Sequence, residues 1–369
     1  MNIKLYDEFN EELITRWSLF QKNSSFTVFQ TVEWLQVWWK TFKGTNIKLQ
    51  IVIIENDSKT IIILPLMISD TSLGLKKLSF LGQSHNDYNA PLLSNNFYSY
   101  NIEFKYIWKK ITNSLSNYDF IHFTKQPELI NNISNPMLTI GKFYFHLKSF
   151  HIDIEDNWDV FYSKIKSKVR LDSQRQIKKL NKLGNLEYLV ASSDADKLTI
   201  TKKMIEQKSR RYNDTGVKNI FNDRLNNDFY LNLSKSKYLN QFIHISALLL
   251  DNQIIATHLG LQDKGTYYYL MPTFESGDWK KFSSSRILLE FLLKQSMDNK
   301  DNIFDFTVGG ESYKKTWCNS NLNHYQNIDF SSFKGFFYYS FLLLKIKIKA
   351  NNKLNLFTEN ILSFFNIKL

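Results

Sequence analysis

One succession of predicted elements occurs twice in the sequence, and this duplication constrains the fold more than any other feature. In the first half, a β-hairpin, a third strand, a helix and a fourth strand are predicted at 47–54, 60–68, 76–81, 97–115 and 118–123. In the second half the same elements are predicted at 242–250, 254–261, 266–272, 284–298 and 303–308. A helix also precedes each hairpin, at 31–42 and at about 195–213. The pattern indicates a duplicated α/β unit, and the alternative is that two generic α+β patterns coincide.

The length and composition are those of a globular protein that binds an anion. A chain of 369 residues with 43% hydrophobic residues is long enough for two domains. Its net charge of +12 favours nucleic acid, a phosphorylated cofactor, a sugar nucleotide or an anionic membrane surface as partner. The single cysteine excludes an internal disulfide, and the acidic N-terminus has no signal-peptide pattern. We expect a cytoplasmic protein.

A basic segment lies between the two halves. Residues 161–184 are predicted as one amphipathic helix, with Ile165, Val169, Ile177 and Leu180 on a shared face. Eight residues from 164 to 182 are Lys or Arg, against one acid. Arg170 and Arg175 are candidates for bidentate contacts with phosphate, for instance of a nucleotide-linked sugar acceptor. The alternative is a solvated face beside an apolar stripe.

The helix predicted from 284 offers a second place for an anion. A helix start with free backbone N–H groups and a nearby cation can hold a pyrophosphate. The candidate cofactor-binding residues are Lys281, Ser283, Ser284, Ser285 and Arg286. Serine is a common N-cap residue, so a normally capped helix with solvated lysines is the alternative.

Several stretches, in this order, resemble those of a known family. They are "FQTVEWLQVWWKTF", "ILPLMI", "LSFLGQSHNDYNAPLL", "IKSKVRLDSQRQIKKLNKLG", "IIATHLGL" and "FDFTVGGESYKKTW". Together they cover about 29–317 and resemble the CelD/BcsL-like acyltransferases of the GNAT superfamily, distant relatives of the FemAB peptidyltransferases. The resemblance implies two tandem GNAT-like domains, each with a mixed, mainly antiparallel twisted sheet flanked by helices. We expect a degenerate domain at 1–150, an acyltransferase domain at 151–332 that includes the basic helix 163–183, and a basic aromatic helical tail at 333–369.

The resemblance also implies an activity. We expect transfer of an acyl group, most simply acetyl, from acyl-CoA to an amine or hydroxyl of a sugar in cell-surface polysaccharide or glycolipid synthesis. A longer acyl-CoA and acyl carrier protein are alternative donors. Relatives carry glycine where this chain has three serines at 283–285, so two alternatives stay open. One is a FemAB-like aminoacyl transferase that uses tRNA, and the other is a catalytically dead binding module of polysaccharide assembly.

Direct acyl transfer needs an oxyanion donor and a base. The resemblance implies that backbone N–H groups near Met271 polarise the thioester. Glu311 is the candidate base because it follows two glycines, and Tyr313 is the candidate acid for the leaving thiolate. Lys314 matches a lysine that FemAB-like enzymes use to stabilise the donor or the tetrahedral intermediate. A surface glutamate and a packed tyrosine are the alternatives.

A loop in the first half supplies the last candidates. His85, Asp87 and Tyr88 stand in "GQSHNDYNAP", which the resemblance places near the acceptor, although Asp87 can also serve the turn itself. We expect His258 and Cys318 to be core residues and expect no metal site. The tail after 333 has two interpretations: peripheral contact with the inner membrane surface, or packing against the second domain, which we favour.

Overall fold

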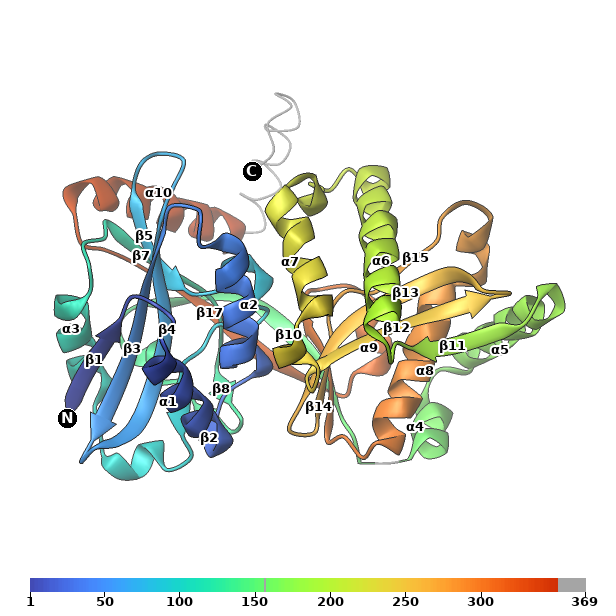
Figure 1. Ribbon diagram of the computed structural model, residues 1–369, viewed down its shortest axis with the longest axis horizontal. Coiled ribbons are helices and arrows are strands. Elements are labelled where there is room, and N and C mark those ends of the chain that lie inside the picture. The colour runs from blue at the N-terminus through green and yellow to red at the C-terminus, as the bar shows by residue number, and fades with distance from the viewer. Residues whose placement is uncertain (156, 351–369) are drawn as a thin grey trace. The chain divides into compact units, whose positions relative to one another are not determined.

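The computed structural model describes residues 1–155 and 157–350 of the chain (Figure 1). These residues form two compact units. Unit 1 comprises 1–26, 45–146 and 323–350, and unit 2 comprises 27–44, 147–155 and 157–322. A division of the chain into folding domains at 150 and 332 stays a prediction; by contacts, 27–44 lie with unit 2. The last 19 residues of the predicted tail lie outside the described part.

Unit 1 is built around a mixed, mainly antiparallel sheet. Its central strands follow the order β1-β3-β4-β5-β7-β17, in which only the β5–β7 pair is parallel. The strands are β1 (Asn2–Tyr6), β2 (Ser24–Ser25), β3 (Ile47–Asn56), β4 (Lys59–Asp70), β5 (Lys76–Phe80), β6 (Leu92–Ser94), β7 (Phe120–Pro127), β8 (Leu129–Ile130), β9 (Ile133–Ser134) and β17 (Ser320–Phe330). The α-helices are α1 (Glu11–Lys22), α3 (Phe104–Ser114) and α10 (Phe333–Ala350).

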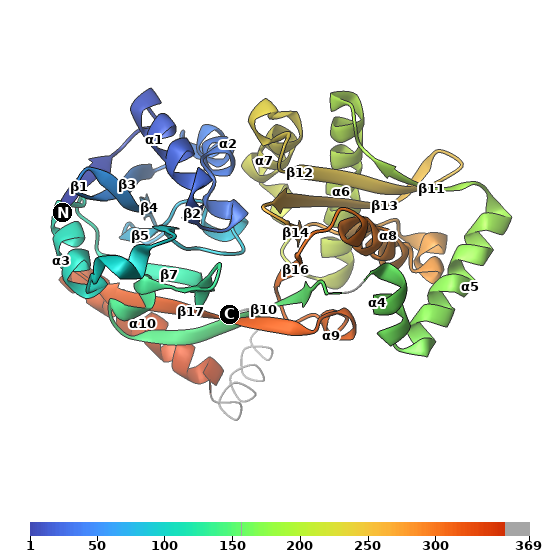
Figure 2. The same ribbon diagram turned by 90° about the horizontal axis from the view of Figure 1, so that it is seen from below.

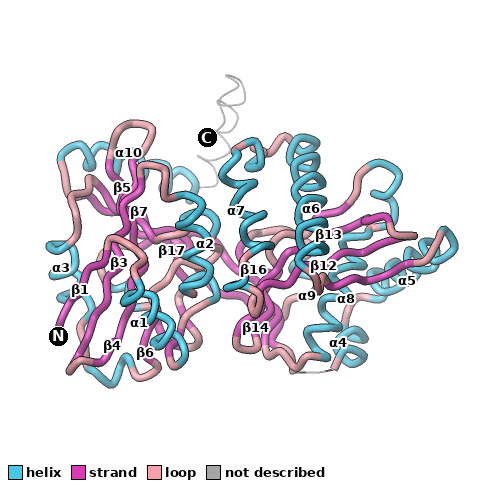
Figure 3. Tube along the Cα trace, viewed as in Figure 1, coloured by secondary structure: helices cyan, strands magenta, loops and turns pink. Residues whose placement is uncertain are grey.

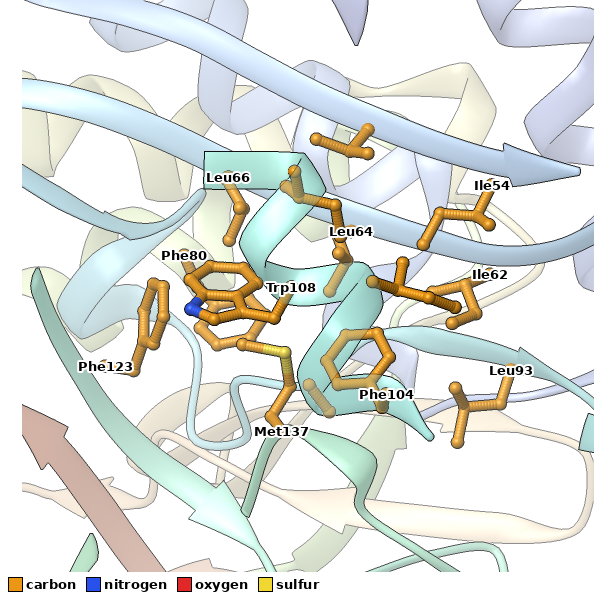
Figure 4. Packing of buried hydrophobic residues seen from close by; sticks show 14 of the residues in the cluster. Ile54, Ile62, Leu64, Leu66, Phe80, Leu93, Phe104, Trp108, Phe123 and Met137 are labelled. Carbon is orange, nitrogen blue, oxygen red and sulfur yellow. The ribbon is translucent and has the colours of Figure 1, made fainter. Parts of the chain in front are cut away.

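The core of unit 1 lies between this sheet and α3. Trp108 of α3 packs edge-on against Phe123 of β7, with 5.7 Å between ring centroids. Phe80 and Met137 close the same cluster, and aliphatic side chains of β3 and β4 extend it (Figure 4). The alternation of apolar residues along the strands therefore buries one continuous apolar layer.

Unit 2 repeats this arrangement. Its strands follow the order β11-β12-β13-β14-β16-β10, and only the β14–β16 pair is parallel. The strands are β10 (Phe143–Asp153), β11 (Leu186–Val190), β12 (Ile243–Leu250), β13 (Gln253–Asp263), β14 (Thr266–Tyr269), β15 (Thr273–Phe274) and β16 (Ile303–Val308). The α-helices are α2 (Val32–Phe42), α4 (Trp158–Lys164), α5 (Ser167–Leu183), α6 (Asp194–Thr215), α7 (Arg224–Lys235), α8 (Ser284–Asp298) and α9 (Lys314–Trp317).

The predicted meander, helix and following strand are found in both units (Figure 3), but the helix predicted ahead of the first hairpin, α2, lies with unit 2 by contacts. Both hairpins close with two residues of positive φ, Asp57–Ser58 and Asp251–Asn252. Such turns match the right-handed twist of the flanking strands. In each copy the helix after the meander, α3 or α8, leads into a strand parallel to the third meander strand. The expected fold class, mixed sheets flanked by helices, is confirmed.

The last strand of each unit comes from elsewhere in the chain. β10 follows β7 in sequence, yet its residues 149–153 pair with β16 of unit 2. β17 follows β16, yet its residues 324–330 pair with β7 of unit 1. Each unit is therefore completed by the strand that follows the other unit's parallel strand.

The predicted helix at 161–184 is two helices, α4 and α5. Ile165 and Lys166 between them are extended, with ψ of 141° and 129°. Ile165 is 6% exposed and belongs to the core cluster of unit 2, together with Leu180. Burial of this isoleucine breaks the helix that the periodicity predicted.

The helix α10 packs on β7 and β17 within unit 1, whereas the sequence favoured packing of the tail against the second domain. Tyr338 lies against Phe120 of β7 with 4.6 Å between ring centroids. A Cβ atom on Gly335 would lie 1.8 Å from the carbonyl oxygen of Asp119, so the helix backbone touches the strand directly. Figure 2 shows α10 alongside β17.

Candidate functional site

The candidate site lies where the two parallel strands of unit 2 end. β14 and β16 pair only from Thr266–Ile303 to Tyr268–Asp305. Beyond this point the chain of β14 turns to form β15 on β13, whereas β16 continues beside β10. Ligands of α/β sheets bind at the carboxyl ends of parallel strands that part in this way. We call this region the strand-end site. It comprises 269–272, 283–286, 307–314 and the facing residues Lys208 and Arg211 of α6.

The backbone of β16 is strained at this end. Thr307 has φ of 58°, a conformation that a β-branched residue adopts only where its surroundings impose it. Its N–H donates to the Asp305 carboxylate at 2.7 Å, and the pairing with β10 shifts register between Ser149 and His151. Such a conformation costs about 1–3 kcal/mol, and bulges of this kind re-aim side chains next to active sites.

Lys314 holds this strained segment in place. Its side chain is 3% exposed, and its ammonium group donates to the carbonyl oxygens of Val308 at 2.9 Å and Thr307 at 3.4 Å. The third partner is the Glu311 carboxylate at 3.0 Å. An ammonium group has three N–H donors, and all three are used here. In this arrangement Lys314 positions the end of β16 and has no donor left for an acyl intermediate.

Glu311 is held as the partner of that lysine. Burial raises the pKa of the Glu311 carboxyl, but the hydrogen bond and charge of Lys314 outweigh burial and lower it below its usual range. A Cβ atom on Gly309, whose φ is 129°, would lie 2.4 Å from the Glu311 carboxylate, so only glycine leaves room for this pair. A carboxylate with a lowered pKa is a weak proton acceptor near neutral pH.

Tyr313 is partly exposed to solvent, and its phenol has a raised pKa. Its side chain is 39% exposed, and its ring packs edge-on against Phe306 at 6.2 Å. Partial burial and the nearby charge of Glu311 raise the pKa of Tyr313. The phenol is therefore protonated at neutral pH and is chemically able to donate that proton.

Two cations of α6 reach the same site and escaped the sequence analysis. Lys208 donates to the carbonyl oxygen of Pro272, just after β14, at 3.3 Å. Burial and the charge of Arg211 lower the pKa of Lys208 to about 8, against the opposing charge of Glu311. An amine with such a pKa is partly unprotonated near neutral pH and can accept a proton. Arg211 also acts on Tyr313, whose pKa it lowers against burial.

The sequence did contain a signal for Lys208. The buried stripe of α6 runs through Ile200, Met204 and Gln207. Position 208 lies four residues after Met204 and therefore on the same face of the helix. A lysine on a core-facing stripe indicates a buried amine, but the groups that it meets come from distant parts of the chain.

At the start of α8 the backbone adopts a left-handed conformation that favours glycine, but the residue there is a serine. Ser283 precedes the helix with φ of 53°, in the left-handed region, and its side chain makes no capping hydrogen bond. The hydroxyl of Ser284 donates to the carbonyl oxygen of Ile255 at 3.2 Å. Ser285 hydrogen-bonds Tyr269 of β14, which opposes the effect of burial on the pKa of that tyrosine. The serines thus fix the helix start to β13 and β14 and do not cap it as expected.

The arginine expected beside this helix start, Arg286, and the two expected to bind the acceptor's phosphate from the basic segment, Arg170 and Arg175, all have partners within the protein. Arg286 and Arg175 both form ion pairs with Asp172 of α5, and the hydrogen bond from Arg286 lowers the pKa of Asp172. Arg170 donates from Nε to the carbonyl oxygen of Ile165 at 2.9 Å.

Two further donor-site candidates differ in availability. Lys281 is exposed and lies 5.3 Å from the centroid of the Phe282 ring. The N–H of Met271 donates to the carbonyl oxygen of Leu259 at 2.9 Å. The sequence predicted that this amide would polarise the thioester, but its N–H is already used within the sheet.

The candidates of the first half lie in one loop of unit 1, which Lys125 holds through Asp87 and two backbone carbonyl oxygens. The Lys125 ammonium donates to the carbonyl oxygens of Ser84 and Asn86 and pairs with Asp87 at 3.2 Å. Tyr88, 4% exposed, stacks on the imidazole of His324 with 4.8 Å between centroids. These contacts hold the loop together.

His85 is half-buried within the same loop. A role of His85, Asp87 or Tyr88 in binding an acceptor stays a prediction.

Three expectations about the remaining reactive groups can be compared with the structure. His258 is fully buried, its Nδ1 lies 3.2 Å from the Tyr267 hydroxyl, and burial holds its pKa well below the usual range. Burial and the charge of Asp305 raise the pKa of Cys318 to about 12, so the thiol stays protonated. In the described part of the chain, no three His, Cys, Asp or Glu side chains are placed to hold a metal ion. No helix among residues 1–155 and 157–350 is long and apolar enough to cross a membrane.

A known protein family matches the segment of the chain that contains the strand-end site. Residues 167–315 match the model of the Acetyltransferase (GNAT) domain family, which supports an acyltransferase. The matched segment contains α5, α6, β14, α8 and β16, and therefore the whole strand-end site. The sequence matches no curated protein.

Solved structures share the fold over most of the chain. A conserved protein of unknown function from Bacteroides thetaiotaomicron is 10% identical, with a TM-score of 0.56 over 89% of this chain and 100% of that chain. FemX is 11% identical, with a TM-score of 0.56 over 88% of this chain and 97% of that chain. The L-PGS of Bacillus licheniformis is 10% identical, with a TM-score of 0.51 over 88% of this chain and 93% of that chain. At such low identities the likeness concerns the fold alone.

Proposed function

We propose that the strand-end site transfers an acyl group from an acyl-CoA, most simply acetyl-CoA, to an amine or hydroxyl of a sugar destined for a cell-surface polysaccharide or glycolipid. The observation that carries this proposal is the parting of β14 and β16 beside the start of α8, within the segment that matches the GNAT domain model. Free N–H groups at a helix start suit a pyrophosphate, and GNAT domains use acyl-CoA donors. The sugar acceptor and the CelD/BcsL-like assignment rest on the resemblance of the sequence.

In the proposed reaction, the acceptor attacks the thioester carbon directly, and its proton passes to an unprotonated amine. We assign that amine to Lys208, because its pKa of about 8 suits a base better than the lowered pKa of Glu311. The C–S bond then breaks, and Tyr313 donates its proton to the leaving thiolate. The phenolate of Tyr313, a residue that is 39% exposed, then takes a proton from solvent, and the Lys208 ammonium releases its proton to solvent, so both groups return to their starting forms. Lys314 and Glu311 keep the end of β16 in the conformation that presents Tyr313.

A binding experiment tests the donor. Acetyl-CoA, longer acyl-CoAs, the same acyl chain on acyl carrier protein, and aminoacyl-tRNA are each added to the full chain, and the thermal unfolding midpoint is measured. A ligand that binds only the folded protein raises this midpoint with the logarithm of its concentration. We expect the shift with a CoA thioester. A shift with tRNA alone would favour an aminoacyl transferase, and the proposal fails if no CoA species shifts the midpoint.

The pH dependence of turnover tests the base. With a hydroxyl acceptor, kcat/KM should rise tenfold for each pH unit below about pH 8 and level off above it, because only unprotonated Lys208 accepts a proton. Lys208→Met should remove this rise and lower kcat/KM at pH 8 about a hundredfold. Lys202→Met, at an exposed position of the same helix, is the matched control and should behave as the wild type. An unchanged pH profile in Lys208→Met would exclude Lys208 as the base.

A further inference from the structure

The outward face of α10 carries a continuous apolar stripe. Phe333, Phe337, Phe341 and Leu344 have side chains that are 78%, 61%, 54% and 58% exposed. Their spacings of four, four and three residues place them on one face of the helix. Single exposed apolar residues are ordinary on a protein surface, but a row of large ones marks an interaction site.

This face is held outward by packing on the other side of the helix. Gly335 lies in direct contact with the carbonyl oxygen of Asp119, and the ring of Tyr338 packs on Phe120. Tyr339 packs on Phe330 of β17, with 5.2 Å between centroids. Because the inward face is packed against β7 and β17, the helix cannot turn its phenylalanines inward without losing these contacts.

The charged residues of α10 itself all have one sign, although Lys334 also acts on the Asp119 carboxylate of unit 1. Lys334 follows Phe333 and Lys345 follows Leu344, so each lies about 100° around the helix from the residue it follows and beside the edge of the stripe formed by Phe341. Lys347 is exposed as well, and the sequence from 333 to 350 contains four lysines and no acidic residue. Aromatic and aliphatic side chains flanked by cations are the composition of helices that lie in the interface of an anionic membrane.

We propose that α10 attaches unit 1 to the surface of an anionic lipid bilayer. The helix axis lies in the membrane plane, the stripe enters the boundary between headgroups and acyl chains, and the lysines meet anionic headgroups. α10 lies on the membrane without spanning it, in keeping with the lack of a membrane-crossing helix among the described residues. This inference does not depend on the acyl transfer proposed above.

Charge favours the bilayer over the two other occupants of this face. A second copy of α10 would bring lysines against lysines, which is unfavourable. The sequence 351–369 contains two lysines and one glutamate, and so it offers no net negative charge to the stripe. Anionic headgroups supply both the missing charge and an apolar layer beneath it.

Sedimentation with vesicles tests the proposal on the full chain. Vesicles of phosphatidylcholine alone are compared with vesicles that also contain phosphatidylglycerol. We expect binding to the anionic vesicles, weakened by 0.5 M salt, because screening shortens the reach of the lysines. The double variant F337S/F341S should bind more weakly by roughly tenfold for each phenylalanine replaced. The matched control L73S/Y106S removes two other exposed apolar side chains of unit 1 and should bind as the wild type does.

Other outcomes overturn the proposal. It fails if the wild type does not sediment with anionic vesicles, if it binds neutral vesicles equally well, or if both double variants lose binding alike. A wild type that is dimeric in solution without binding vesicles, while F337S/F341S is monomeric, would assign the face to a second copy. Binding that appears only after deletion of 351–369 would assign it to that segment. If F337S/F341S does not fold, F333S, at the first helical position, takes its place.

Discussion

The parallel strands β7 and β16 end with similar backbone features, but the end of β7 is covered by a loop and the end of β16 is partly exposed. In unit 1, β7 shifts register against β17 near Lys125, whose φ is 53°. In unit 2, β16 shifts register against β10 near Thr307, whose φ is 58°. At both ends a lysine donates to backbone carbonyl oxygens and pairs with one carboxylate, Asp87 or Glu311. The duplication therefore extends to a register shift, a residue of positive φ and a paired lysine at the strand end, although Lys125 holds a neighbouring loop and Lys314 holds the strand itself.

The difference lies in what surrounds each strand end. In unit 1 the loop 82–89 covers it, and the side chains of Asn86 and Asn89 hydrogen-bond each other and the adjoining backbone. In unit 2 the corresponding residues leave Tyr313 and the Glu311 carboxylate partly exposed, and Lys208 adds an amine of lowered pKa. The end of β7 is thus covered by a loop, whereas side chains at the end of β16 are partly exposed. For this reason we assign the chemistry to unit 2.

The largest effect is expected from the two lysines. Lys314→Met leaves the carbonyl oxygens of Thr307 and Val308 without their donor and the Glu311 carboxylate without its cation, and the buried acceptors left unsatisfied make the loss about 3 kcal/mol. Lys125→Met should cost about 2 kcal/mol, because its side chain is 18% exposed and water replaces part of what is lost. Urea unfolding gives the free energies, and hydrogen exchange assigns each loss to its unit.

Turnover separates the two copies further. At a temperature where both variants are folded, Lys314→Met should also lose kcat/KM, whereas Lys125→Met should keep it. Equal loss of turnover in both variants would contradict the assignment of the chemistry to unit 2.

The repeated elements could be predicted from the sequence because their signals are local. Each hairpin has two apolar runs joined at an Asp-containing turn, and β16 lies exactly where it was predicted, at 303–308. The exchange of β10 and β17 could not be predicted, because the sequence of a strand does not show which distant strand it pairs with. The end of β16 was hidden for another reason. A threonine disfavours positive φ, so its conformation follows from Asp305 and Lys314 and not from its own preference.

The candidate residues show the same limit. Sequence could point to Glu311, Tyr313 and Lys314 as a group, because they are adjacent in the chain. It could not show that Lys314 uses all its donors within the protein, or that Lys208 lies near the end of β14, 64 residues away in the chain from Pro272. Roles that depend on free donors and shifted pKa values need the tertiary structure.

The smaller effect is expected from the glycine that each copy places against a side chain. Gly82 has φ of 95°, and a Cβ atom there would lie 2.3 Å from Oδ1 of Asn86, which is 1% exposed and cannot move without losing its hydrogen bonds. Gly82→Ala should therefore cost about 2–3 kcal/mol, for backbone strain together with the displaced amide.

Gly309→Ala should cost about 2–3 kcal/mol in stability as well, from strain at positive φ and from the carboxylate that the buried ammonium group of Lys314 loses. The group in its way is the end of the Glu311 side chain, which is 56% exposed and can swing into solvent. Moving that carboxylate removes its charge from beside Lys208, so the pKa of the amine falls further below 8. The rise of kcat/KM with pH should then shift to lower pH in Gly309→Ala and stay in place in Gly82→Ala, measured at a temperature where both are folded. A shift in both variants, or in neither, would mean that the carboxylate held by Gly309 does not act on the proposed base.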